Sequence, residues 1–150
     1  MKKVLTVVVA ALCIAGPLPL GASTSAPAEV RVAAWNVKVT VNYKGKGTVD
    51  ASHKVWVWLF DTPNIGAGSQ PLDQIALDKN GTVADFANVV PGQVWIAVAF
   101  DQQGVMTGNE PPPSGSPIAI YSADAGAPSP VTPGEKAAVT ITFDETMRMP

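Results

Sequence analysis

One stretch decides the fold class of this 150-residue chain: WNVKVTVNY at residues 35–43. Aromatic or aliphatic residues stand at every odd position, and Asn, Lys or Thr stands at every even position. Successive side chains of a β-strand point to opposite faces of its sheet, so this alternation is typical of a strand with one buried and one wet face. The stretch therefore predicts a β-strand that borders a hydrophobic core.

Two further stretches are apolar at nearly every position, KVWVWLF at residues 54–60 and QVWIAVAF at residues 93–100. Such runs are typical of strands that are covered on both faces. Between them, the segment DKNG at residues 78–81 is typical of a β-hairpin turn, because Asn and Gly tolerate positive φ. Shorter strands are predicted at residues 72–77, 82–86, 118–121 and 136–143.

No helical period of useful length appears after residue 28, and the chain contains 13 Gly and 14 Pro. Residues 101–117 and 124–134 are rich in Pro or Gly and are predicted to be surface connections. Many short strands separated by such turns indicate two packed sheets. We therefore predict an all-β fold for residues 29–150, a single seven-stranded antiparallel β-sandwich of immunoglobulin-like or prealbumin-like type.

The first 28 residues have the layout of a secretory signal peptide. Lys2 and Lys3 precede an apolar run at residues 4–15, and APA at residues 26–28 offers a cleavage site. The run is too short to cross a bilayer core of about 30 Å. We therefore predict export to the periplasm or the extracellular space, with no integral membrane segment in the mature chain.

Cleavage would remove the single cysteine, Cys13, so the predicted domain has no disulfide in an oxidising compartment. Loss of Lys2 and Lys3 would also change the formal net charge from −2 to −4. An acidic domain without a basic stripe has nothing to neutralise phosphates, which argues against nucleic acid as a partner.

Six positions follow a turn signature in which Gly precedes Phe, and Pro-Gly precedes a strand that ends in Asp. They are Gly81, Phe86, Val89, Pro91, Gly92 and Asp101. This pattern resembles the prealbumin-like domains, the carboxypeptidase regulatory-like group and related exported bacterial families, over roughly residues 36–144. The resemblance implies a seven-stranded sandwich that serves as an accessory or binding module without a catalytic site. Members with an Asn-rich acidic loop after the last strand of the signature differ from this chain, which has Gln102 and Gln103 there.

Three tryptophans are the candidate ligand-binding residues. Trp56 and Trp58 share one face of their predicted strand, and Trp95 lies on the face that also carries small alanines. If the aliphatic faces point into the core, all three tryptophans point outward. Three interpretations remain open: a surface covered by the N-terminal segment or the Pro-rich loop, a protein interface with Trp as anchor, or a platform for sugar rings.

The sequence also contains candidate calcium ligands. Acidic and amide residues end strands or lie in loops, and oxygen ligands of that kind suit calcium, but their spacing matches no complete calcium loop; they are Asp61, Asp101, Asn109, Glu110 and Asp124. We therefore predict no metal and no cofactor.

His53 is the only histidine, and no GxSxG nucleophile motif is present, so we predict that the protein is not an enzyme. Met147 and Met149 could bind Cu(I) together with His53, or they could belong simply to a frayed C-terminal tail. The sequence thus predicts an exported, non-catalytic module for protein interaction or assembly, with carbohydrate binding through Trp56, Trp58 and Trp95 as the alternative.

Overall fold

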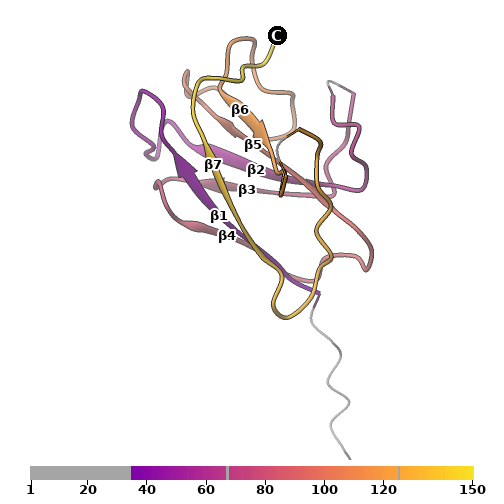
Figure 1. Ribbon diagram of the computed structural model, residues 1–150. Coiled ribbons are helices and arrows are strands. Elements are labelled where there is room, and N and C mark those ends of the chain that lie inside the picture. Colours follow the sequence, from indigo (N-terminus) through magenta and orange to yellow (C-terminus); the bar gives the residue numbers. More distant parts are fainter. Residues whose placement is uncertain (1–34, 67, 125) are drawn as a thin grey trace, which may run out of the picture. The chain divides into compact units, whose positions relative to one another are not determined.

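The computed structural model describes residues 35–66, 68–124 and 126–150 (Figure 1). The predicted signal peptide at residues 1–28 lies outside the described residues. All regular structure in the described part of the chain is β-strand, which confirms the all-β prediction. No helix within these residues has the length and apolar character needed to cross a membrane.

The strands form two sheets. One sheet has three strands in the order β4-β1-β7, and the other has four strands in the order β3-β2-β5-β6 (Figure 1). The strand bounds are β1 Val37–Tyr43, β2 Val55–Phe60, β3 Asp73–Leu77, β4 Val83–Phe86, β5 Trp95–Phe100, β6 Ile118–Ile120 and β7 Ala138–Phe143. Each lies within a stretch that the sequence predicted as a strand.

The core contains the apolar side chains of one face from each sheet. In β1 the odd positions from Val37 to Tyr43 are buried, whereas Lys38, Thr40 and Asn42 are exposed or half-buried, as the alternation predicted. The four-stranded sheet contributes Val55, Val57 and Leu59 from β2, together with Ile96, Val98 and Phe100 from β5. The arrangement is that of a β-sandwich, in which the inward faces of two sheets pack against each other.

One strand pair differs from the predicted antiparallel arrangement. β1 runs parallel to β7, with Val39 opposite Val139 and Tyr43 opposite Phe143, whereas every other strand pair in the described residues is antiparallel. Parallel neighbours need a long crossover connection. Here the connection is almost the whole domain, since it passes through the four-stranded sheet before β7 returns beside β1. An alternating pattern reads the same in both chain directions, so the sequence could not predict that β1 and β7 run parallel.

The predicted hairpin at Asp78–Gly81 is also wrong. The turn joins β3 to β4, and these strands belong to different sheets. Gly81 has φ +75°, as the turn signal indicated. The Asn80 side chain has a different role: its Oδ1 accepts a hydrogen bond from the Tyr43 backbone N–H at 2.7 Å, and its Nδ2 donates to the Tyr43 carbonyl at 2.7 Å. The Asn80 side chain therefore pairs with the backbone at the end of β1, as a neighbouring strand would.

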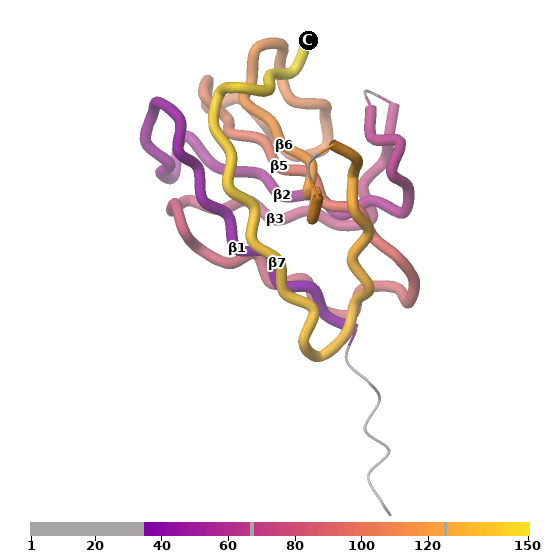
Figure 2. The backbone as a smooth tube through the Cα atoms, in the orientation of Figure 1, coloured from indigo at the N-terminus to yellow at the C-terminus, as the bar shows by residue number. Residues whose placement is uncertain are grey.

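The C-terminal tail is not frayed. The Met147 carbonyl accepts a hydrogen bond from the Ile118 N–H, and the Met149 carbonyl accepts one from the Gly115 N–H. The Met149 N–H in turn donates to the Ser116 carbonyl. Figure 2 shows the end of the chain beside the segment that leads into β6. These bonds attach the tail to the edge of the four-stranded sheet.

Asn80 provides a first test of this architecture. Asn80→Ala removes both hydrogen bonds to the Tyr43 backbone and is expected to lower the free energy of unfolding by about 1–2 kcal/mol. Asn64→Ala, at an exposed loop position, is the matched control and should change it by less than about 0.5 kcal/mol. Urea denaturation of both variants measures the difference, and equal losses would contradict the bridging role of Asn80.

Tyr43 provides a second test, because its hydroxyl meets a carboxylate at the edge of the core. The hydroxyl lies 3.0 Å from Glu145 Oε1 and 3.0 Å from the Lys46 carbonyl oxygen. The ring stacks on Phe100, with ring centroids 4.4 Å apart. Burial, the hydrogen bond to Glu145 and the charge of Glu145 raise the pKa of Tyr43 to about 12.

The folded protein therefore holds the Tyr43 proton more tightly than the unfolded chain, in which a tyrosine pKa is about 10. This contribution to stability is complete below about pH 10 and is lost as the pH rises towards about 12. Phenylalanine has no proton to lose, so the free energy of unfolding of Tyr43→Phe should fall less than that of the parent protein as the pH rises through this range. Urea denaturation of both proteins between these pH values measures it, and parallel pH profiles would refute the prediction.

Candidate functional site

A second apolar cluster lies on the face of the four-stranded sheet that points away from the core. It contains the buried residues Trp58, Phe60, Ala97 and Ala99. Partly buried apolar side chains pack against them: Trp56, Ile65, Met106, Ile118 and Ile120. The aliphatic residues of β2 and β5 point into the core, which meets the condition set by the sequence analysis, and Trp56 and Trp58 lie on the opposite side. The central strands β2 and β5 are thus apolar on both faces, and loops must cover the outer one.

The two tryptophans of β2 are stacked. The ring centroids of Trp56 and Trp58 are 6.2 Å apart, with 17° between the ring planes. Their neighbours in β5 are small, since Trp56 lies opposite Ala99 and Trp58 lies opposite Ala97. A larger residue at either alanine would compete with the indole for the same space. The small alanines therefore let both indoles pack over the sheet.

The connection between β5 and β6, residues 101–117, crosses the stacked pair of Trp56 and Trp58 and is called the strap below. The Nε1–H of Trp58 lies 3.0 Å from the Gly108 carbonyl oxygen and 3.2 Å from Gln74 Oε1. Gln74 Nε2 donates to Asn109 Oδ1 at 3.1 Å. Trp58 is only 5% exposed as a result. The Trp58 nitrogen of β2 thus links the strap to β3 through hydrogen bonds.

Gly108 cannot be replaced without strain at this position. Its φ is +88°, and a Cβ atom would overlap the Trp56 ring and lie 2.8 Å from Gln74 Nε2. The backbone of the strap therefore lies directly on the aromatic side chains, where only glycine fits.

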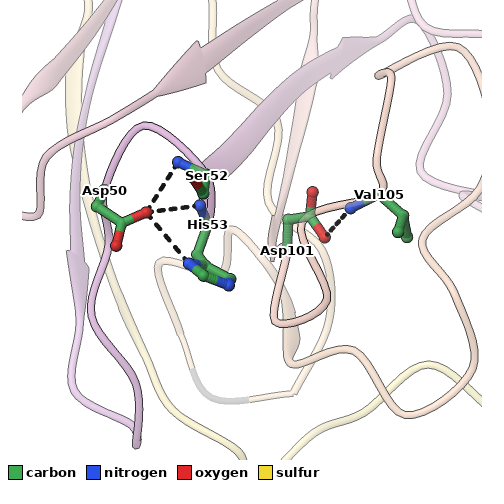
Figure 3. A network of polar contacts seen from close by, with 5 residues as sticks. All are labelled: Asp50, Ser52, His53, Asp101 and Val105. Carbon is green, nitrogen blue, oxygen red and sulfur yellow. Dashed lines mark hydrogen bonds and ion pairs between the residues drawn. The ribbon is translucent and has the colours of Figure 1, made fainter.

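The strap begins at Asp101, which is 3% exposed at the end of β5. Its Oδ1 accepts a hydrogen bond from the Val105 N–H at 3.0 Å, and its Oδ2 accepts one from the Met106 N–H at 2.8 Å. Figure 3 shows the bond to Val105. A carboxylate that receives two backbone N–H groups fixes a tight turn. Asp101 thus sets the direction in which the strap leaves the sheet.

A pocket of about 130 Å³ opens between the strap and the connection from β2 to β3. Its floor is formed by side chains on the outer face of the sheet, namely Trp58, Phe60, Ala97, Ile118 and Ile120. Residues of the strap, including Pro111 and Pro112, line one side, and Ile65 and Pro71 from the β2–β3 connection also line it. Met149 of the C-terminal tail lines it as well. The lining is mostly apolar.

A second, more polar pocket of about 290 Å³ adjoins the first, because Gln70, Pro71 and Asn109 line both. It also includes Leu72, Asp73 and Gln74. Amide and carboxylate groups thus lie next to the apolar pocket.

The three tryptophans predicted as ligand-binding residues do not form one open platform. Trp58 is buried under the strap, Trp56 is half-buried, and only Trp58 lines the apolar pocket. Trp95 is half-buried at the start of β5, opposite Phe60, and lies outside the second cluster.

Sequence reasoning missed Gly108, Asn109 and the two isoleucines of β6 as pocket residues. The alternation of Ile118 and Ile120 with Ala119 was a usable signal, because Ala119 packs against the core while both isoleucines face the other cluster. Gly108 gave no such signal, since its role depends on how the strap lies over Trp56.

His53 lies in a polar loop apart from this pocket. Asp50 Oδ1 accepts hydrogen bonds from the backbone N–H groups of Ser52 and His53, both at 2.8 Å, and lies 3.1 Å from His53 Nδ1 (Figure 3). These backbone bonds lower the pKa of Asp50. Among the described residues, no three His, Cys, Asp or Glu side chains gather as a metal-binding group. The Asp50 carboxylate is therefore a turn-forming group in this loop.

Comparison of the chain with protein-family models, curated proteins and solved structures gives no match.

Gly108 gives a direct test of the strap. Gly115→Ala is the matched control, because Gly115 has a similar φ of +85° but no atom within 4 Å of the added Cβ. The control is expected to lower the free energy of unfolding by about 1–2 kcal/mol, because alanine is strained in the left-handed conformation. Gly108→Ala should cost more and should shift tryptophan emission to the red, because the strap must move away from Trp56 and Trp58. Urea denaturation followed by fluorescence measures both effects. Identical losses and unchanged spectra would contradict the close contact.

Proposed function

We propose that this chain is an exported, non-catalytic β-sandwich module that binds a protein partner, with the apolar pocket beside Trp58 as the contact site. The observation that carries the proposal is the pocket itself. Its floor is made of aromatic and aliphatic side chains of a rigid sheet, and its sides are formed by two loops and the C-terminal tail. A volume of about 130 Å³ suits a single inserted group, since an apolar cavity of about 150 Å³ in another protein holds benzene.

The shape of the site favours a protein partner over a polysaccharide. A sugar platform needs flat, accessible aromatic rings, whereas Trp58 is covered by the strap. A partner side chain that inserts into a recess between loops is the usual form of an interface anchor. The adjoining polar pocket, with Gln70, Asp73 and Gln74, is the feature that supports carbohydrate binding as the alternative function.

Export and the finer fold type belong to the same proposal. The layout of residues 1–28 supports a cleaved leader. The burial and backbone conformation of the turn-signature positions support the proposed immunoglobulin-like or prealbumin-like type. Phe86 and Val89 are buried, Asp101 anchors the strap, and Gly81 and Gly92 have positive φ.

The proposal is tested by titrating the protein with blocked pentapeptides of the form Ala-Ala-X-Ala-Ala, with X an apolar or basic residue. The readout is the indole N–H signal of Trp58 in two-dimensional NMR. We expect a saturable shift of this signal. It should be lost in Ile120→Asn, which makes the pocket floor polar, and retained in Val83→Asn, the same kind of change at a 48% exposed position of the other sheet.

Three results would count against the proposal. No shift with any peptide would exclude the pocket as a peptide site. Equal loss of the shift in both variants would show that the shift does not report on the pocket. A shift with soluble gluco-, xylo- or chito-oligosaccharides, in place of peptides, would support the carbohydrate alternative.

A further inference from the structure

We infer that the pocket beside Trp58 takes a basic side chain, an arginine or lysine that an extended segment of a partner protein presents. This inference rests on the proposed function and specifies its ligand. The partner's aliphatic stem would lie on the apolar floor, and its charged head would meet acidic and amide groups around the pocket.

The charge of the lining residues supports this choice. Among the described residues that line the apolar pocket, Glu110 is the only charged one. It is exposed and forms no ion pair within the described part of the chain. Asp73 is the only charged residue that lines the adjoining pocket. A ligand in either pocket therefore meets negative charge.

The amide groups around the pocket suit the head of such a side chain. Gln70 and Asn109 line both pockets, and Asn109 Oδ1 already accepts a hydrogen bond from Gln74. A carbonyl oxygen has two lone pairs, so Asn109 Oδ1 retains capacity to accept from a guanidinium or ammonium group. The head of arginine carries five N–H donors and no acceptor, which matches a set of carboxylate and amide oxygens.

The apolar floor suits the stem. Arginine and lysine bury their methylene chains along apolar surface while the charged head stays in water. Phe60, Ile118 and Ile120 supply such a surface below exposed Glu110. A purely aliphatic side chain would use the floor but leave the acidic and amide groups unused, and an acidic side chain would be repelled by Glu110.

The decisive experiment compares matched pairs of side chains in the same pentapeptide. Arginine is paired with citrulline, which keeps the shape but lacks the charge, and lysine is paired with norleucine, which keeps the stem but lacks the ammonium. Dissociation constants come from the Trp58 indole N–H shift at low salt. We expect the charged member of each pair to bind about two- to fivefold more tightly, the range typical of an exposed ion pair.

The protein variant Glu110→Gln should remove most of that preference while leaving the uncharged peptides unaffected. Glu135→Gln is the matched control, since Glu135 is an exposed glutamate that lines neither pocket. Salt at about 1 M should also reduce the preference, because the screening length is then about 3 Å.

The possible failures are distinguishable. If citrulline and norleucine bind as tightly as arginine and lysine, or if Glu110→Gln keeps the full preference, the basic-ligand inference is overturned while the pocket remains a peptide site. If no peptide shifts the Trp58 signal, or only oligosaccharides do, the proposed function itself fails.

Discussion

The two central strands of the four-stranded sheet, β2 and β5, are apolar on both faces, and most other features of the structure follow from this constraint. One face of β2 and β5 supplies the core with Val57, Leu59 and Ile96, while the opposite face carries Trp58 and Phe60. Large apolar side chains left in water would cost free energy and invite aggregation. The strap, the β2–β3 connection and the C-terminal tail therefore all pack on the outer side of the sheet, and the pocket is the space that they leave open.

Backbone and polar groups help to fix the cover over the outer face. Asp101 fixes the start of the strap, and Gly108 allows its backbone to touch the Trp56 ring. The Gly108 carbonyl and the Gln74 side chain satisfy the Trp58 nitrogen, which would otherwise be buried without a partner. In contrast, Trp56 Nε1 is buried and makes no hydrogen bond within the described residues. Trp56 is thus held by the fit of its ring against Trp58 and Gly108.

Most of the strand positions and faces could be predicted from the sequence, because burial on one side of a sheet leaves a period of two. The alternation in β1 is an example, whereas the apolar runs of β2 and β5 predicted strands covered on both faces without saying which face meets the core. Which strands pair with one another could not be predicted in the same way. The Asp78–Gly81 turn has the composition of a hairpin, yet it joins strands of different sheets, since local turn chemistry does not say which strand lies across the gap. For the site, the sequence indicated the tryptophans and offered cover by the Pro-rich loop as one of three interpretations, and the structure buries Trp58 under that loop.

What the sequence determined by itself was the identity of the strands, the side of β1 that faces the core, and the accumulation of Trp56 and Trp58 on one side of β2. These properties depend on neighbouring residues only. The tertiary structure decided the parallel pairing of β1 with β7, the attachment of the tail beside β6, and the pocket bordered by Glu110. Each of these joins segments far apart in the chain, and their meeting depends on how two sheets pack and how the loops close over them, which no local pattern records.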